Sequence, residues 1–283
     1  MPMIATALSR VRLDAPRQFG NLTVYPLVAL EDRAPGYLLL DDALGRGLAR
    51  VTEVSDRGSV PELLFLNDAG EDVLLVDGEE LVGAKQNRVL NTSILIGARQ
   101  TIAVPVSCVE QGRWAWRSRH FASGGSLFAR ARAKKMRRVS ESLRSTGTYA
   151  SDQGEIWDDV QYKLSALNVR SGTASMDDAY RGRAADIEQY VQALQPAAGE
   201  TGAVFAVDGA VAGLDLFDSA AAFRALMQKL VRSYAMDAIE TPGKEQPPLD
   251  EAVRQFLDDM MTAALQRFPG IGKGEQLRLE SAS

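Results

Sequence analysis

The sequence predicts an α+β protein with a mainly antiparallel β core in its N-terminal half, attached helices, and a C-terminal unit of a hairpin and helices. Three observations support this class. Short apolar runs separated by turn residues fill about residues 1–116. Stretches rich in good helix formers follow over about 120–195. A further strand pair and helical periodicity occupy about 203–268. We expect residues 1–283 to form a single domain, since one hydrophobic core can extend to roughly 250–300 residues.

The expected strands of the N-terminal half cover residues 22–28, 37–40, 60–66, 73–76, 93–96 and 101–109. Most pairs should be antiparallel, because a parallel crossover needs about a dozen residues or more. Pro26 indicates an edge strand or a strand end, because proline has no N–H to donate. The turn residues at 67–71 predict a hairpin between the strands of residues 60–66 and 73–76. A tight turn is expected at Asp77-Gly78, and a short helical turn at 41–44.

The expected helices cover residues 127–143, 154–167, 176–194, 219–239 and 249–268. The Ser-Gly-Gly-Ser run at 123–126 offers capping hydroxyls to the first helix, and Asp218-Ser219 caps the fourth. Acids at Asp177 and Asp178 suit the first turn of the third helix. In the fourth helix, apolar residues recur every three or four positions, which predicts one buried face.

The C-terminal unit adds elements of other types. Asp208-Gly209 predicts the turn of a hairpin between residues 203–207 and 210–214. Residues 241–248 hold three prolines and a glycine, which predicts a loop. Residues 275–280 are expected to form an edge strand or a loose tail.

The composition predicts a packed globular protein, because 46% of the residues are hydrophobic and 24% are charged. No run of about 18 apolar residues predicts a membrane span. The first residues lack the basic patch and apolar run of a secretory signal. The single cysteine, Cys108, allows no internal disulfide and fits a reducing compartment, so we expect a cytoplasmic location.

The scarcity of metal-binding side chains narrows the classes of site. With one histidine, His120, and one cysteine, the chain cannot build a His-rich zinc centre, a CxxC pair or an iron–sulfur site. A metal would have to be a hard cation held by carboxylates. We expect no metal, and the sequence identifies no cofactor.

Basic residues are concentrated in one segment of an otherwise acidic chain. Residues 113–144 contain ten basic residues and one acid, a local charge of +9 against −14 for the remainder. The ten are Arg113, Arg117, Arg119, Arg130, Arg132, Lys134, Lys135, Arg137, Arg138 and Arg144. Such a stripe can attract phosphates, an acidic partner or the acidic surface of its own chain, and we favour the last for a folded acidic protein.

The densest polar motif lies in residues 77–116. Lys85, Gln86, Asn87 and Arg88 follow one another between apolar strands, so part of the run should border the core. Buried polar side chains need partners, and the nearest candidates are the three glutamates Glu79, Glu80 and Glu110. In a strand over 102–110, Glu110 would continue the apolar face of Cys108. We expect an ion pair of Glu110 with Lys85 or Arg88.

Three runs of the sequence, 77–93, 104–114 and 209–238, resemble a domain family named for its association with ADP-ribosylglycohydrolases and rhodanese-phosphatase-superfamily proteins. The Gly-Ala-Lys-Gln-Asn-Arg and Val-Ser-Cys-Val-Glu strings are specific to it, and Asp152-Gln153 with Trp157 is similar to its pattern. The resemblance covers nearly the whole chain. It implies a link to nucleotide or ADP-ribose metabolism without an established reaction.

These motifs give a set of candidate site residues. The candidates for catalysis are Glu80, Glu110 and Cys108; those for substrate binding are Lys85, Gln86, Asn87, Arg88, Asn91 and Trp114. One of Glu79 and Glu80 paired with Glu110 would suit acid–base work on a glycosidic or phosphoester bond. A cysteine inside an apolar strand is more often a small buried hydrophobe than a nucleophile, and His120 would reach Cys108 only if the chain reversed after Trp116.

Two further patterns have ordinary alternatives. The Ser-Gly-Gly-Ser run could bind phosphate through its backbone N–H groups, but it lacks the Lys-Ser/Thr ending of a P-loop. Trp114, Trp116 and Phe121 alternate with arginines, which suits stacking on bases, although packing of aromatic rings against guanidinium stems is more frequent.

Two hypotheses of function result. The first is an enzyme, a hydrolase or transferase, acting on a nucleotide-derived or phosphorylated small molecule, with an anionic ligand as its partner. The second is a non-catalytic module that contacts an acidic protein or nucleic acid through the basic stripe of residues 113–144. Nucleic acid is not the expected partner under the first hypothesis. The sequence does not indicate an oligomeric state.

Overall fold

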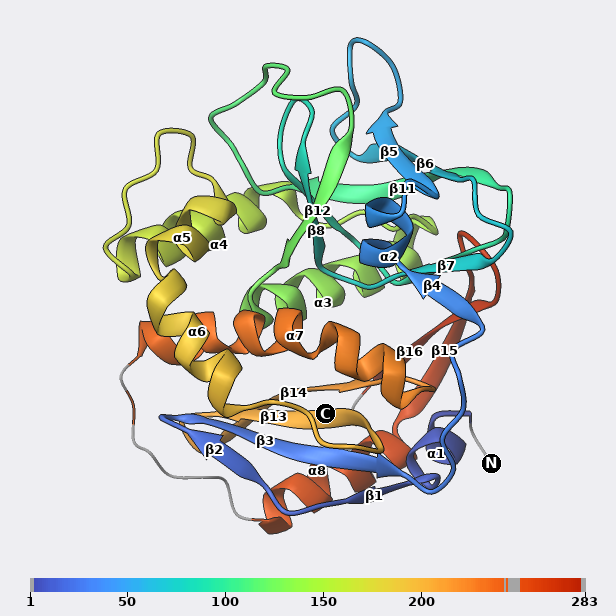
Figure 1. Ribbon diagram of the computed structural model, residues 1–283, viewed down its shortest axis with the longest axis vertical. Coiled ribbons are helices and arrows are strands. Elements are labelled where there is room, and N and C mark those ends of the chain that lie inside the picture. Colours follow the sequence, from blue (N-terminus) through green and yellow to red (C-terminus); the bar gives the residue numbers. More distant parts are fainter. Residues whose placement is uncertain (1–2, 242, 244–249, 281–283) are drawn as a thin grey trace. The chain divides into compact units, whose positions relative to one another are not determined.

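The computed structural model describes residues 3–241, 243 and 250–280 (Figure 1). It is an α+β structure with mostly antiparallel sheets, as the sequence predicts. The backbone divides into two compact units. The terminal unit comprises residues 1–35, 185–268 and 275–283, and the central unit comprises 36–184 and 269–274. A single domain over 1–283 stays a prediction, and the two units are described separately.

The terminal unit is built on an antiparallel sheet in the order β1-β3-β13-β14, with β2 also paired to β3. Its strands are β1 (Val11–Leu13), β2 (Arg17–Phe19), β3 (Leu22–Ala29), β13 (Glu200–Val207), β14 (Ala210–Leu216), and the separate pair β15 (Ala264–Pro269) and β16 (Glu275–Glu280). Its helices are α1 (Met3–Leu8), α6 (Ala184–Ala193), α7 (Ala220–Glu240) and α8 (Asp250–Thr262).

Helices cover both faces of this sheet. Phe205 on β13 stacks on Tyr234 of α7, with ring centroids 4.1 Å apart. The adjacent residue, Val204, lies in a cluster with Val253 of α8. Because neighbouring residues of a strand point to opposite faces, α7 and α8 lie on opposite sides of the sheet, as Figure 1 shows. This explains why β13 is buried along nearly its whole length.

Two local predictions in the terminal unit are confirmed. Asp208 and Gly209 have positive φ values of 53° and 78° and join β13 to β14 in the expected hairpin. The Ser219 hydroxyl accepts hydrogen bonds from the backbone N–H groups of Ala221 and Ala222, which caps α7. The prediction for Pro26 was wrong, because β3 lies inside the sheet. The proline is tolerated there because β1 and β2 pair with β3 on either side of residues 25–26.

The central unit contains a six-stranded sheet in the order β12-β8-β9-β11-β6-β5 and a three-stranded sheet in the order β10-β7-β4. The strands are β4 (Tyr37–Leu39), β5 (Ala49–Glu53), β6 (Glu62–Asn67), β7 (Asp72–Leu75), β8 (Glu79–Gly83), β9 (Arg88–Leu90), β10 (Ile94–Ile96), β11 (Thr101–Cys108) and β12 (Phe121–Ser126). The helices are α2 (Leu40–Gly45), α3 (Ala129–Thr146), α4 (Gln153–Ala166) and α5 (Met176–Gly182).

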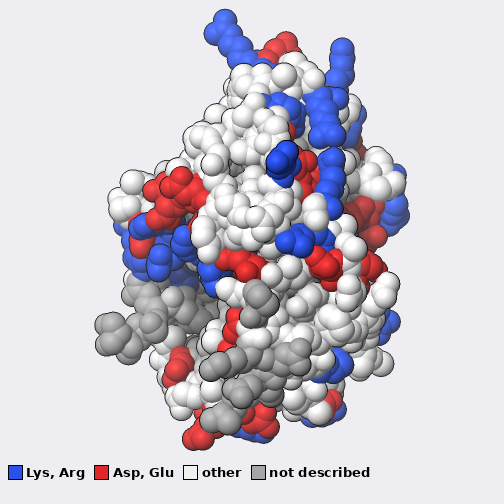
Figure 2. Space-filling model, turned by 90° about the vertical axis from the view of Figure 1, so that its left-hand side faces the viewer, with Lys and Arg blue, Asp and Glu red and all other residues white. Residues whose placement is uncertain are grey.

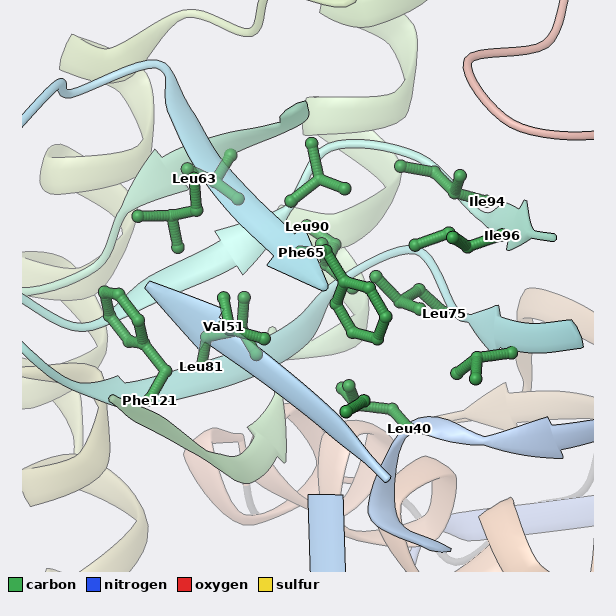
Figure 3. Packing of buried hydrophobic residues seen from close by; sticks show 14 of the residues in the cluster. Leu40, Val51, Leu63, Phe65, Leu75, Leu81, Leu90, Ile94, Ile96 and Phe121 are labelled. Carbon is green, nitrogen blue, oxygen red and sulfur yellow. The ribbon is translucent and has the colours of Figure 1, made fainter. Parts of the chain in front are cut away.

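One hydrophobic core joins the two sheets of the central unit (Figure 3). Phe65 and Val51 come from the six-stranded sheet, Leu75 and Ile94 from the three-stranded sheet, and Leu40 from α2. All five side chains are at most 2% exposed. The six-stranded sheet is therefore fixed on its apolar side, and the polar motif of residues 77–116 runs through its middle strands.

The predicted hairpin of residues 60–66 and 73–76 was wrong. Strand β6 pairs with β11 and β5, whereas β7 pairs with β10 and, in parallel, with β4. Asn67, the last residue of β6, donates to the carbonyl oxygens of Glu71 and Gly97, so the connection directs the chain into a different sheet. The turn at Asp77-Gly78 is present, with Glu79 N donating to Val76 O at 3.1 Å.

Three helix predictions also differ from the structure. The Ser-Gly-Gly-Ser run belongs to strand β12, and α3 has Phe128 at its N-cap without a side-chain hydrogen bond. The helix predicted over 176–194 is divided at Arg183 into α5 and α6. The last helix ends at Thr262, and the residues after it form β15, which pairs with β16. Of the loop predicted over 241–248, residues 242 and 244–248 lie outside the described residues.

Candidate functional site

The run from Lys85 to Arg88 connects β8 to β9 within the six-stranded sheet, and all four of its side chains are buried. The connection is closed by Asn87, whose Oδ1 accepts from Gly83 N at 3.1 Å. Asn87 O accepts from Val109 N at 3.1 Å, which places the loop beside the end of β11. Glu110 is therefore the next polar side chain that the loop meets.

Glu110 is neutralised by Arg113 rather than by Lys85 or Arg88, so the expected ion pair was wrong. Arg113 Nη2 donates to Glu110 Oε2 at 2.6 Å. The Asn87 backbone N–H donates to the same oxygen at 3.1 Å, and Thr173 Oγ1 donates to Oε1 at 2.9 Å. Burial acts to raise the pKa of Glu110, but these hydrogen bonds outweigh it and lower the pKa below its ordinary value. Glu110 is therefore an ionised, fully partnered carboxylate.

Glu80 has the opposite protonation state. Burial, with a smaller contribution from the charge of Asp177, raises its pKa to about 8. Its two oxygens meet Asn87 Nδ2 and Gly125 N, each at 3.4 Å. Asn87 thus contacts both glutamates, one neutral and one ionised near neutral pH. Pairs of carboxyl groups with separated pKa values are typical of acid–base sites, although structural networks also produce them.

Lys85 lies apart from this network, against two tryptophans. Its ammonium is 5.3 Å from the Trp114 ring centroid and 5.1 Å from that of Trp116. It donates to Asp56 O at 2.5 Å, and the Lys85 backbone N–H donates to Glu53 Oε1 at 3.3 Å. The tryptophans themselves are 48% and 50% exposed. Half-exposed indole rings above a buried cation form a surface on which a flat ring can stack.

A cleft of about 860 Å³ opens beside this cluster. One part of its lining is the end of β5 and the loop after it, with Thr52, Glu53, Ser55 and Asp56. The other part is the segment before β12, with Trp116, Arg117, Ser118, Arg119 and His120. The arginines and His120 are exposed and can bind anionic groups, whereas the hydroxyl groups of Ser55 and Ser118 can orient them.

Gly83 shapes the wall of this cleft. Its φ is +132°, and an added Cβ would lie 2.5 Å from Ser118 Oγ and 2.9 Å from His120 O. Arg113 donates to Ala84 O at 2.6 Å and to Ala115 O at 3.0 Å, and Arg117 N donates to Ala84 O at 2.9 Å. The Glu110–Arg113 pair therefore positions the backbone that carries both tryptophans and the cleft arginine.

The sequence model of one protein family, described as the ARG and Rhodanese-Phosphatase-superfamily-associated Protein domain, matches residues 10–283. The chain belongs to this family. The match covers nearly the whole chain and confirms the resemblance inferred from the motifs of residues 77–114. Neither the curated proteins nor the solved structures include a match to the chain.

In this member of the ARG and Rhodanese-Phosphatase-superfamily-associated Protein domain family, the other candidate residues support the sheet. Arg88 Nη1 donates to Gln86 Oε1 at 2.7 Å, and Gln86 Nε2 donates to Glu110 O at 3.0 Å. Burial lowers the pKa of Arg88. Asn91 accepts from Ser107 Oγ at 2.6 Å and donates to Tyr149 O at 3.0 Å. The structure thus separates Asn91 from the residues that line the cleft.

Cys108 is fully buried at the end of β11, opposite Arg88 on β9. Its Sγ lies 3.3 Å from Glu110 O. Gln153 accepts from Cys108 N and donates to Cys108 O, both at 2.8 Å, which fixes the backbone on either side of the thiol. No hydrogen bond joins Cys108 to His120 among the described residues.

Much of the basic stripe is paired with acids of the same unit. Lys134 donates to Asp159 at 2.6 Å, Lys135 pairs with Asp77, and Arg138 pairs with Glu141 at 2.9 Å and also with Glu155. On the face shown in Figure 2, basic and acidic side chains lie beside one another. Arg113, which pairs with Glu110, and several residues on α3 are therefore neutralised within the unit, whereas Arg117 and Arg119 are exposed at the cleft.

Several residues of the cleft were absent from the predicted set, namely Glu53, Trp116, Arg117, Arg119 and His120. Glu53 had a usable signal, because Ala49, Val51 and Glu53 alternate with polar residues, so the acid continues an apolar face. Within residues 3–241, 243 and 250–280, no three His, Cys, Asp or Glu residues are grouped to hold a metal ion. No helix in this part of the chain is long and apolar enough to cross a membrane.

Proposed function

We propose that the protein is an enzyme that acts on a nucleotide-derived or phosphorylated small molecule bound in the cleft between the β5 loop and the segment before β12. The observation that supports this most directly is the combination of a half-exposed Trp116 with Arg117 and Arg119 in one cleft. An aromatic face binds a base or sugar ring, and guanidinium groups bind phosphate. The family name, which records association with ADP-ribosylglycohydrolases, suggests ADP-ribose as one ligand to test.

The polar network behind the cleft supports the acid–base part of the proposal. Glu80 would supply a proton, since its raised pKa keeps it protonated near neutral pH, and Glu110, which its hydrogen bonds keep ionised, would be the acceptor. Lys85 and Trp114 would contact the substrate, and Gln86, Asn87 and Arg88 would position the groups around it. Asn91 and Cys108 would not contact the substrate and would instead maintain the packing of β11 against its neighbouring strands.

Ligand-induced thermal shifts test the binding step, because a ligand that binds only the native state raises Tm. The probes are AMP, ADP-ribose, ribose 5-phosphate and inorganic phosphate. We expect AMP and ADP-ribose to raise Tm more than phosphate does, because base stacking on the indole adds roughly 1–3 kcal/mol. The absence of a shift with all four probes would overturn the proposal.

Matched variants locate the site. Trp116→Ala should weaken AMP binding, whereas Tyr162→Ala, at a similarly exposed aromatic residue on α4, should not. Arg117→Met should weaken binding of every phosphorylated probe, and Arg137→Met on α3 serves as its control because Arg137 is also exposed. Equal effects of the site and control variants would place the ligand elsewhere.

A further inference from the structure

The inner end of the cleft contains a carboxylate oxygen that no protein group satisfies. Glu53 lines the cleft and is 7% exposed. Its Oε1 accepts from Lys85 N at 3.3 Å, but its buried Oε2 has no hydrogen-bond partner among the described residues. Burying an acceptor without a donor costs roughly 1–3 kcal/mol, and more for a charged group. Such an atom marks a position where a bound donor would be stabilised.

Unsatisfied donors lie deeper, on Arg88, which is not itself among the residues that line the cleft. Arg88 is fully buried, and within the described part of the chain its Nε and Nη2 have no hydrogen-bond partner. The guanidinium interacts electrostatically first with Cys108 and then with Glu53, and no ion pair joins Arg88 to Glu53 among the described residues. The Arg88 guanidinium lies 5.6 Å from the Trp114 ring centroid. Atoms of Trp114 and Glu53 Oε2 lie within 3.2 Å of the same point, the Cβ position of Gly58.

The charges at this inner end restrict the group that it can bind. The unsatisfied Glu53 Oε2 needs a hydrogen-bond donor, which an ionised phosphate lacks, and an ammonium would be repelled by Arg88 and Lys85. A hydroxyl group is neutral, can donate to Glu53 Oε2 and can accept from Arg88. The exposed Arg117 and Arg119 offer a separate position for the phosphate of the same molecule.

We propose that this inner end is a subsite for a sugar hydroxyl, with Glu53 as the acceptor and Arg88 as the donor, so that the substrate is a ribose-containing phosphate rather than its deoxy counterpart. This subsite rests on the proposed function, because it is the inner part of the same cleft. It gives the substrate a direction, with the ribose hydroxyl inward and the phosphate at the cleft arginines. A site built to hydrogen-bond a hydroxyl discriminates against an analogue that lacks it, because the buried partners are then left unpaired.

Calorimetric titration of the full chain with AMP, 2′-deoxy-AMP and 3′-deoxy-AMP tests the subsite. We expect at least one deoxy analogue to bind roughly 10- to 100-fold more weakly than AMP, as for loss of a hydrogen bond to a charged group. Glu53→Gln should reduce this difference, since the amide oxygen is an uncharged and therefore weaker acceptor. Glu62→Gln, at an exposed glutamate on the adjacent strand β6, should preserve it.

The outcomes separate the subsite from the proposed function. If all three nucleotides bind with equal affinity, the cleft binds nucleotides but the hydroxyl subsite is wrong. The same conclusion follows if Glu53→Gln discriminates among them as strongly as the unaltered protein. If no nucleotide binds, both proposals fail. The comparison of AMP with its deoxy analogues in the unaltered protein decides the question even if Glu53→Gln does not fold.

Discussion

Arg113 Nη2 donates at once to Glu110 Oε2, at 2.6 Å, and to Asn87 Oδ1, at 3.1 Å. One guanidinium therefore neutralises the buried carboxylate and fixes the side chain that bridges to Glu80. The same group reaches the carbonyl oxygens of Ala84 and Ala115, on either side of the cleft wall. Stability and the shape of the cleft depend on the same pair of residues.

Removal of Arg113 should be strongly destabilising. In Arg113→Met, Glu110 would be left buried and unpaired, so we expect a loss of roughly 3–5 kcal/mol in the free energy of unfolding. The double variant Arg113→Met/Glu110→Gln should recover part of this loss. Denaturant unfolding of the two single variants and the double variant measures the coupling.

An exposed ion pair provides the control for this cycle. Arg138 pairs with Glu141 on the surface of α3, with side chains 37% and 44% exposed. Arg138 also pairs with Glu155, and Arg138→Met should still cost much less than Arg113→Met, because solvent screens exposed pairs. If Arg113→Met costs equally little, the Glu110–Arg113 pair is not a structural element of the cleft wall.

Glu80 should make stability fall as pH rises. Its carboxyl group has a pKa of about 8 in the folded protein against an ordinary value of 4.5, so the folded state retains a proton that the unfolded chain releases. The stabilisation is fully present below the ordinary pKa and is lost as pH rises through about 8. The slope from this group is at most about 1.4 kcal/mol per pH unit.

Comparison with Glu80→Gln isolates this contribution, because the amide does not titrate. Unfolding free energies of both proteins are measured between about pH 5 and about pH 8. We expect the stability of the unaltered protein to decline relative to that of Glu80→Gln over this range. Parallel curves would show that Glu80 titrates normally in the folded protein.

The sequence predicts what depends on near neighbours. The Asp208-Gly209 hairpin and the Ser219 cap are specified within a few residues, and both are confirmed. The pairing of β6 with β11 and β5 rather than with β7 is not local, because all these strands are apolar and the choice is made by the shared core. The turn residues at 67–71 indicate that the chain reverses direction after β6, but they do not indicate which strands β6 pairs with.

The same limit applies to the candidate site. Alternation along β11 predicts that Glu110 continues the face of Cys108, but the strand ends at Cys108, and the following turn brings Arg113 to the carboxylate. The flanking strands predicted that part of the run from Lys85 to Arg88 borders the core, and the structure buries all four side chains. Asn87 contacts Glu80 and Glu110, which were predicted as partners from the sequence, whereas Glu53 and Asp56, the partners of Lys85, are distant in sequence and were not foreseen. The pattern of charged residues in the sequence identifies the segment of residues 77–116. Which residues line the cleft can be seen only in the folded structure, because they come from separate parts of the chain.

Cys108 should be unreactive in the folded protein. Its side chain is fully buried, and attack by a thiol reagent requires an accessible thiolate. We expect a thiol reagent to modify Cys108 only at the rate of local or global unfolding, measured against the denatured chain. Rapid modification of the native protein, together with loss of activity in Cys108→Ala, would instead support a nucleophilic role, the less favoured of the two interpretations of Cys108 from the sequence.

Gly83→Ala should damage both stability and the cleft. The methyl group would lie 2.5 Å from Ser118 Oγ and 2.9 Å from His120 O, and the residue has a φ of +132° that side chains rarely adopt. Overpacking and backbone strain together should cost roughly 2–4 kcal/mol in the free energy of unfolding. Ser118 and His120 both line the cleft, so relief of the clash should displace its wall and weaken AMP binding as well.

Gly172→Ala is the matched control, since no atom lies within 4 Å of its Cβ position, and it should leave stability unchanged or raise it by up to about 1 kcal/mol. Thermal unfolding with and without AMP measures both effects in each variant. If Gly83→Ala unfolds and binds like Gly172→Ala, the segment of residues 118–120 is not held against β8, and the cleft does not have the wall on which the proposed function depends.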